Sequence, residues 1–218
     1  MEYKEIKHHP EVLALLSKGN DNLGTLGYTD HSRAHCALVA EQAGNILTQF
    51  GYPEHDIQLV KIAGFMHDIG NAINREHHAE YGALLAGDIL RSTDMPVEDR
   101  VTIMSTIANH DESTGTAVDA ISAALIIADK TDVRRNRVRT QNRAEFDIHD
   151  RVNYAVKESK LRLNAESKII SLNLQVDEEI CTMYDYFEIF FGRMQMCRRA
   201  ANILGATFRV TVNGNRVL

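Results

Sequence analysis

The sequence predicts a mainly α-helical protein, with a helical core over residues 1–145 and a small α+β unit over residues 146–218. Two observations support this prediction. Apolar residues recur at helical spacing along the first part, and from about residue 158 they alternate with polar residues, which is the period of a strand. No internal repeat or low-complexity linker is visible between the two parts. We therefore expect one helical core that carries an appendage.

Capping and helix-breaking residues set the expected helix boundaries in the first part. Pro10 opens a helix that Gly19 closes, and Thr29 or Asp30 caps the next one. Pro53 opens a third helix, which runs into an adjacent His-Asp pair. The complete set of expected helices covers residues 10–18, 30–50, 53–66, 77–91, 97–109 and 117–138.

The second part is expected to combine strands with one long helix. Residues 170–176 alternate between apolar and polar side chains, and residues 160–164 alternate in the same way and are a candidate partner strand. Asp177 is placed to cap a helix over 178–204, and a last strand is expected over 208–212. The apolar long helix leaves open a homodimer interface as one role of the appendage.

Composition excludes several classes of protein. The chain has 24 Lys plus Arg against 30 Asp plus Glu, a net charge of −6, which argues against nucleic acid as a partner. No apolar run approaches the roughly 18 residues of a membrane span, and the first residues do not resemble a signal peptide. Cys36, Cys181 and Cys197 are odd in number and far apart, as expected for reduced thiols of a cytoplasmic protein.

Imidazole and carboxylate side chains follow one another near the ends of the expected helices. His67 and Asp68 end an apolar helix, where an unpaired buried carboxylate would cost several kcal/mol. Nitrogen and oxygen ligands suit Fe or Mn best here, with Ni, Co, Mg or Zn as alternatives. Six groups exceed what one ion needs and suffice for two ions that share a carboxylate. The expected ligands are His35, His67, Asp68, His78, His110 and Asp129.

Two choices within this set rest on local context. His31 and His35 share a helix face, and His35 lies deeper, before an apolar stretch, so we expect His35 to bind metal. His31, beside the capping turn, is expected to act as a general acid or to contact substrate. His77 and His78 are adjacent, and we prefer His78 because it shares a face with Gly82, where helices can approach closely. His77 remains the alternative.

A run of basic residues follows the last expected ligand. Arginine forks suit phosphate oxygens, and Lys130 and Arg134 lie nearest the metal site. We therefore expect both to bind substrate, and Lys130 also to neutralise charge during catalysis. A solvated basic helix face is the alternative interpretation. The run consists of Lys130, Arg134, Arg135, Arg137, Arg139 and Arg143.

The order His35, His67-Asp68, Asp129 resembles that of the HD-domain metal-dependent phosphohydrolases, over about residues 29–139. His31 and His35, four residues apart, also resemble the HxxxH helix of cyclic-nucleotide phosphodiesterases. In those enzymes the first histidine donates a proton and the second binds metal. Two-metal members add two further histidines before the last aspartate, at positions that His78 and the histidine at 110 match.

The resemblance narrows the substrate. The chain lacks the GYP element of cyclic-di-GMP phosphodiesterases and the Glu-Asp that follows the HD pair in guanosine-tetraphosphate hydrolases. Asp129-Lys130, with Arg134-Arg135 soon after, looks more like bacterial diadenosine tetraphosphate hydrolases. The resemblance implies that a small phosphorylated substrate, expected to be a nucleotide, loses a phosphate ester or anhydride bond to a metal-activated hydroxide, with Asp68 among the catalytic groups.

Two other functions remain open on the sequence alone. A minority of proteins that resemble this one use two irons and dioxygen to oxidise a C–H bond, with the same six ligand types. A non-catalytic nucleotide-binding regulator would use the same pocket without turnover. The appendage after residue 158 could close the pocket, form the dimer interface or bind a regulator.

Overall fold

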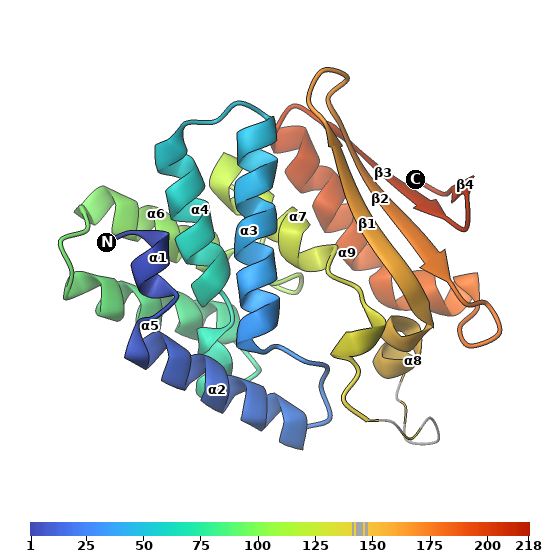
Figure 1. The fold of residues 1–218 in the computed structure, drawn as a ribbon, viewed down its shortest axis with the longest axis horizontal. Coiled ribbons are helices and arrows are strands. Elements are labelled where there is room, and N and C mark those ends of the chain that lie inside the picture. The colour runs from blue at the N-terminus through green and yellow to red at the C-terminus, as the bar shows by residue number, and fades with distance from the viewer. Residues whose placement is uncertain (141, 143–145, 147) are drawn as a thin grey trace.

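The structure, a computed structural model, describes residues 1–140, 142, 146 and 148–218. It confirms the predicted fold class, because the chain is mainly α-helical with a small sheet near its end (Figure 1). The helices are α1 Tyr3–Ile6, α2 Pro10–Thr25, α3 Arg33–Gln49, α4 Glu54–Met66, α5 His78–Arg91, α6 Val97–Ala108, α7 Ala120–Lys130, α8 Ile148–Ala155 and α9 Met183–Ile203, with short 3-10 turns η1 Ile69–Ala72 and η2 Arg135–Arg137.

The end of helix α2 and the start of helix α3 differ from the prediction. Helix α2 continues through Gly19, where a Cβ would lie only 3.0 Å from the Ala72 nitrogen, so this glycine serves a close approach of η1 and does not end the helix. Helix α3 is capped by Ser32, whose side chain accepts a hydrogen bond from the Ala34 nitrogen. Asp30 does not cap, because its carboxylate accepts from the Ser32 hydroxyl at 2.7 Å.

Helix α7 is much shorter than the predicted 117–138 helix. It begins after Asp119, which caps it, and it ends at Lys130. The chain then leaves the helix, and Arg137 donates to the backbone oxygens of Asp132 and Asp30 at 2.9 and 3.0 Å. Through these bonds the segment after Lys130 supports the loop before α3. The basic run is therefore not one face of a helix.

The appendage forms a four-stranded sheet in the order β1-β2-β3-β4. Strands β1 (Val156–Asn164) and β2 (Ile169–Val176) pair with each other, as the sequence predicted, and their pairing is antiparallel. Strand β2 pairs parallel to β3 (Thr207–Val212). The short β4 (Asn215–Arg216) completes the edge. Helix α9 provides the crossover between the parallel strands, which such a connection requires.

Helix α9 starts later than predicted and lies between α7 and the sheet (Figure 1). Thr182 caps it in place of Asp177, since Thr182 and Asp185 bond each other's backbone nitrogens reciprocally in a capping box. Buried Phe190 of α9 and the buried alternate residues of β2 belong to one hydrophobic core. The appendage therefore packs directly on the helix whose last turn carries the expected ligand Asp129.

The predicted division of the chain at residue 145 falls among residues outside the described part, and it stays a prediction. Among the described residues no helix combines the length and apolar character needed to cross a bilayer.

Candidate metal centre

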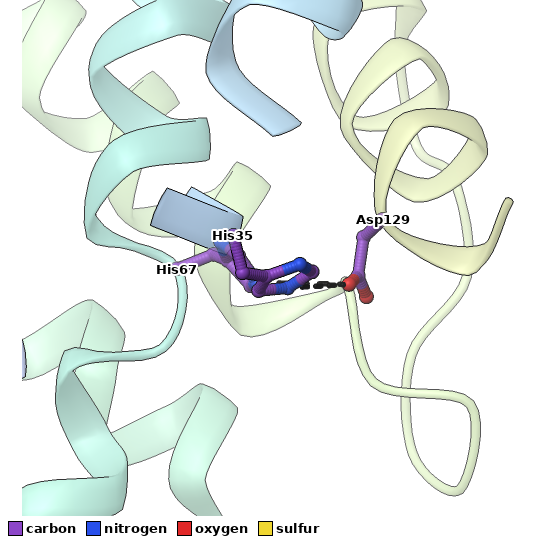
Figure 2. Close-up of side chains that lie close together, drawn as sticks. All are labelled: His35, His67 and Asp129. Carbon is purple, nitrogen blue, oxygen red and sulfur yellow. Dashed lines mark ion pairs between the residues drawn. The ribbon is translucent and has the colours of Figure 1, made fainter. Parts of the chain in front are cut away.

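Three expected ligands meet where helices α3, α4 and α7 converge (Figure 2). The Nε2 atoms of His35 and His67 lie 3.3 and 3.7 Å from the Oδ1 atom of Asp129. Helices α3 and α4 can bring the two imidazoles together because a Cβ at Gly64 would lie 2.8 Å from the Ala40 Cα, an approach that only glycine permits. We call His35, His67 and Asp129 the first triad.

Asp68, His78 and His110 form a second triad beside the first. Asp68 joins the two, because its Oδ2 lies 3.3 Å from the His67 Nε2 while its Oδ1 lies 3.8 Å from the His78 Nε2. The Asn71 amide donates to the same Oδ1 at 2.8 Å and fixes the carboxylate. The six expected ligands thus form two adjoining groups that share one carboxylate.

The second triad depends on close packing between η1 and the start of α5. A Cβ at Gly70 would collide with the backbone oxygen of His78, and it would lie 2.5 Å from the Gly82 nitrogen. The chain enters α5 through His77, which adopts a left-handed φ of 60° and is exposed. Of the two adjacent histidines, the structure therefore turns His78 toward the centre.

The histidines present the same nitrogen to the interior. Three imidazoles donate their Nδ1 hydrogens to backbone oxygens: His67 to Gly64 at 2.8 Å, His78 to Arg75 at 3.1 Å, and His110 to Ile107 at 2.7 Å. A neutral imidazole that donates from Nδ1 carries its lone pair on Nε2. The backbone thus sets the tautomer in which Nε2 is ready to bind a cation.

These inward atoms fit divalent ions. The Nε2 atoms of His35 and His67 and the Oδ2 of Asp68 are buried and have no hydrogen-bond partner among the residues that the structure describes. The Nε2 atoms of His78 and His110 lie 3.2 Å apart, a separation at which two lone pairs repel unless a cation lies nearby. Nitrogen or oxygen ligands about 2.1 Å from one ion at tetrahedral angles are roughly 3.4 Å apart. The observed separations match that requirement.

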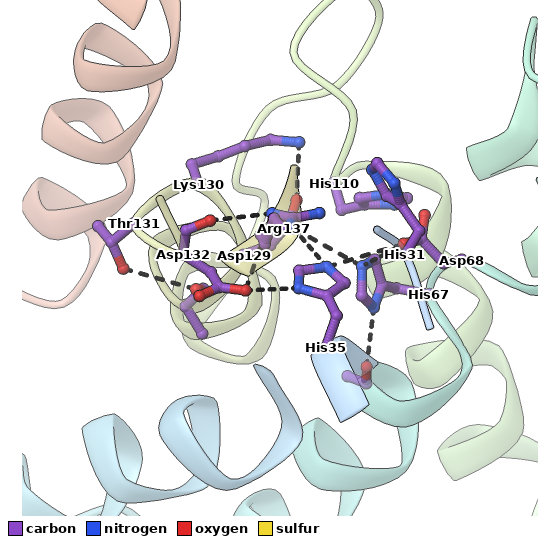
Figure 3. A network of polar contacts seen from close by, with 12 residues as sticks. His31, His35, His67, Asp68, His110, Asp129, Lys130, Thr131, Asp132 and Arg137 are labelled. Atoms are coloured by element: carbon purple, nitrogen blue, oxygen red, sulfur yellow. Dashed lines mark hydrogen bonds and ion pairs between the residues drawn. The ribbon is translucent and has the colours of Figure 1, made fainter. Parts of the chain in front are cut away.

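Asp132 is a functional candidate that the sequence analysis did not single out. Its carboxylate accepts the Nδ1 hydrogen of His35 at 2.7 Å and is also bound by Arg134 and approached by Arg137 at 3.8 Å (Figure 3). Burial disfavours its ionisation, but the bond from His35 and the arginine charges outweigh burial and hold the pKa of Asp132 well below its usual range. Its spacing of three residues from Asp129 was the available signal.

Neighbouring groups set the ionisation of the carboxylates and imidazoles in the centre. Burial opposes ionisation of Asp68, but the neighbouring His67 and His31 hold the pKa of that carboxyl well below its usual range. Burial lowers the pKa of His67, but Asp68 raises it more, so the net shift is upward. Burial lowers the pKa of His78 and His110, which stay neutral. A bound ion would replace the proton of His67.

His31 and Lys130 lie at the cavity above the triads. The Nδ1 of His31 is 2.7 Å from the Thr29 oxygen, which leaves Nε2 for the cavity. Burial lowers the pKa of His31 well below its usual value, although Asp68 acts in the opposite direction. The Lys130 ammonium lies 2.8 Å from the Oδ2 of Asp129 and is buried.

The basic run serves several purposes. The Arg134 guanidinium forms an ion pair with Asp132, and Arg134 is not among the residues that line the cavity. Its role in substrate binding therefore stays a prediction. Arg135 and Arg139 donate to the backbone oxygens of Tyr154 and Tyr28 at 2.6 and 2.8 Å. Arg143 lies outside the described residues.

The cavity over the metal centre has an even balance of charge. Because its formal charges cancel, each divalent ion bound there would give it a positive charge suited to anionic ligands. The appendage contributes part of the wall, through α8 and α9. The cationic lining residues are Arg75, Lys130, Arg137 and Arg193, and the carboxylates are Asp68, Glu112, Asp129 and Asp150.

The chain belongs to the HD domain family, whose model matches residues 33–171. It is 26% identical over 68% of its length to an uncharacterised protein of Methanocaldococcus jannaschii, and it covers 66% of that protein. It is 31% identical over 62% of its length to ribonuclease Y of Campylobacter concisus and 29% identical over 62% to that of Enterococcus faecalis, and spans about a quarter (24%) of each.

A solved structure also matches the chain. It is that of a predicted HD superfamily hydrolase from an uncultured Thermotogales bacterium, with a TM-score of 0.45 and 22% identity, over 58% of this chain and 69% of that one. The family match confirms the expected HD domain, and the triads provide clusters that could hold its metal ions.

Proposed function

We propose that this protein is a divalent-metal-dependent phosphohydrolase that cleaves a phosphate ester or phosphoanhydride of a nucleotide. The observation that supports this most directly is the shared carboxylate. Asp68, a member of the second triad, also lies 3.3 Å from His67 of the first, under a cavity lined by four cationic and four carboxylate side chains. Among the described residues, its Oδ2 and the Nε2 atoms of His35 and His67 have no hydrogen-bond partner. Membership of the HD family supports hydrolytic chemistry at such a site.

The two triads would each hold one ion, and Asp68 would contribute to both. Iron or manganese is the expected metal, since imidazole and carboxylate ligands suit both. A divalent ion bound there would lower the pKa of its bound water to about 7 and would polarise phosphoryl oxygens.

The protein's own residues would then position and neutralise the substrate. Lys130, held by Asp129, offers a fixed positive charge next to the ligands, where an anionic phosphoryl group would lie. His31 is oriented by Thr29 so that its Nε2 can carry a proton to the leaving oxygen. Because burial lowers the pKa of His31, this role requires the bound anion to raise it again.

A nucleotide is favoured by the cavity wall as well as by its charge. Tyr28 lines the cavity with a half-exposed ring, and the Arg75 guanidinium lies 5.4 Å from the ring centroid. Such a platform suits the stacking of a base. The likeness of the Asp129-Lys130 segment to diadenosine tetraphosphate hydrolases makes that dinucleotide the first substrate to test.

RNA is the second candidate substrate, because matched relatives carry the name ribonuclease Y. The net charge of −6 disfavours binding to a polyanionic strand. A nucleotide is therefore the preferred proposal, and an RNA oligonucleotide belongs in the same assay.

The test measures release of inorganic phosphate or of a smaller nucleotide by anaerobically purified protein, reconstituted with Mn or Fe, from a panel of mononucleotides, dinucleotides and an RNA oligonucleotide. Chromatography of the products is needed because cleavage of a dinucleotide or of RNA gives nucleotides in place of inorganic phosphate. We expect release from a nucleotide, loss of release in Asp68→Asn, and no effect of His8→Ala, a change at an exposed histidine far along the chain from the ligands. Release that survives Asp68→Asn would contradict the proposal. Substrate-dependent oxygen uptake without release would favour the di-iron oxygenase, and tight binding without turnover would favour the regulator.

A further inference from the structure

We infer that Arg193, supplied by the appendage, binds a second phosphate group of the substrate, next to the one at the metal centre. The inference rests on the proposed function and specifies its substrate class as molecules with adjoining phosphates. It assigns to the appendage a direct part in substrate selection.

Arg193 reaches the cavity because of the way in which α9 packs. Helix α9 lies along α7, whose last residue is Lys130, and both side chains line the same cavity. Lys130 forms an ion pair with the expected metal ligand Asp129, whereas Arg193 reaches the cavity from helix α9 of the appendage. A substrate that extends from the metal centre toward the appendage would pass from one cation to the other.

Arg193 has donors to spare. Its Nε donates to the Glu112 Oε2 at 2.9 Å, and its guanidinium carbon lies 4.7 Å from the centroid of the Phe190 ring. A guanidinium carries five N–H groups, of which this bond uses one. Stacking on an aromatic ring holds the planar group while its edge stays available, and the planar fork suits phosphate oxygens.

Two of the other cationic side chains in the cavity already contact groups of the protein interior. Arg137 is buried and donates to two backbone oxygens, and Arg75 lies 3.3 Å from the His78 Nε2. Arg193 instead pairs with Glu112, whose side chain is 36% exposed, and solvent screens a pair that has such an exposed partner. A phosphate with greater charge can displace that carboxylate at small cost.

The position of Glu112 gives the inference a second, opposite signature. Glu112 follows His110 by two residues and competes for the same guanidinium. Removing Arg193 should weaken binding of the second phosphate, and removing the charge of Glu112 should strengthen it. A merely structural role for the ion pair would make both changes act in the same direction.

The experiment compares two probes that differ by one phosphate group. Dissociation constants of AMP and of non-hydrolysable α,β-methylene-ADP are measured by calorimetry on the manganese-loaded full chain at constant free manganese. In Arg193→Met the preference for the diphosphate should fall about tenfold, the loss of one charge-assisted contact. In Glu112→Gln it should rise about twofold or more, and Arg193→Lys should retain part of it. Arg199→Met, an exposed change on the same helix, should leave it unaltered.

Two results would overturn the inference: a wild-type protein without preference for the diphosphate, or an unchanged preference in Arg193→Met that keeps its melting temperature and metal content. The outcome is separable from that of the proposed function. Phosphate release by the wild type with an unchanged preference in Arg193→Met removes only the role of Arg193. A lost preference in a protein that releases no phosphate from any substrate removes the enzyme and keeps the binding site.

Discussion

The first and second triads contain similar side chains but differ in what surrounds them. In the first, the Asp132 carboxylate accepts the Nδ1 hydrogen of His35, and the inward nitrogens have no hydrogen-bond partner within the described part of the chain. In the second, the Nδ1 hydrogens of His78 and His110 go to backbone oxygens, and the Arg75 guanidinium lies 3.3 Å from the His78 Nε2. A carboxylate behind an imidazole makes it a stronger ligand, whereas a cation before it competes with metal.

The difference teaches that equal ligand types need not give equal sites. We expect the first triad to retain its ion more tightly and the second to exchange its ion more readily. The second triad is also the more open to the cavity, since all its members line it, whereas only Asp129 of the first triad does. We therefore expect the weaker site to be the one nearer the substrate.

The largest effect is expected where the two triads are joined. Asp68→Ala removes the only ligand common to both, so the protein should lose both ions and at least about 10³-fold in kcat/KM. Elemental analysis and phosphate release measure the two losses together. If the variant kept two ions, Asp68 would not be the bridge.

Asp132→Asn tests the carboxylate behind the first triad. It should weaken the tighter ion by about 10- to 100-fold, the usual effect of losing such a support, and should leave the weaker ion nearly unchanged. Competition with a fluorescent chelator resolves the two affinities, and Asp132→Glu should recover part of the loss. A selective effect on the weaker ion would reverse the assignment.

Acid should distinguish the triads as well. Burial lowers the pKa of His67, but the neighbouring carboxylates, Asp68 first, raise it by more, so its net pKa lies above the usual value. Below that raised pKa, His67 must lose a proton before the first ion can bind. The affinity of the first triad should therefore fall by about tenfold per pH unit on the acid side. Burial lowers the pKa of His78 and His110, so the second triad should respond only at lower pH.

Calorimetric metal titrations from pH 8 down to pH 6 measure that difference directly. The tighter ion should lose affinity first as pH falls. Equal pH dependence of both ions would show that His67 and its partner Asp68 do not set the difference.

Arg75→Met is expected to give the smallest effect. Removal of a cation 3.3 Å from the His78 Nε2 should strengthen the weaker ion by about fivefold, since partly screened charges at this range interact by roughly 1 kcal/mol. Arg91→Met, an exposed change at the far end of helix α5, is the control. Metal titration reads both, and weaker binding in Arg75→Met would show that the guanidinium supports the second triad.

The sequence predicted the fold class and brought the correct part of the chain to the centre, because the ligands lie near helix ends that capping and apolar spacing locate. The choice of His78 over His77 also followed from local pattern, through the close approach at Gly82. The brace formed by Arg137 and the support from Asp132 could not be predicted, because both depend on the chain leaving α7 at Lys130 and contacting the distant loop before α3.

The position of Arg193 at the cavity could not be predicted from the sequence either. Periodicity placed it on a long helix but gave no information on which surface that helix covers, and only the packing of α9 on α7 brings it to the cavity. Local rules therefore located the expected ligands, while long-range contacts brought Asp132 to His35 and Arg193 to the cavity.

The most direct test of the account is the metal content of anaerobically purified wild-type protein and of His110→Ala, measured by elemental analysis after equal exposure to iron or manganese. Two triads that share Asp68 predict two ions per chain in the wild type and one in His110→Ala, which removes a ligand of the second triad alone. One ion per chain in both proteins would contradict the two-triad centre.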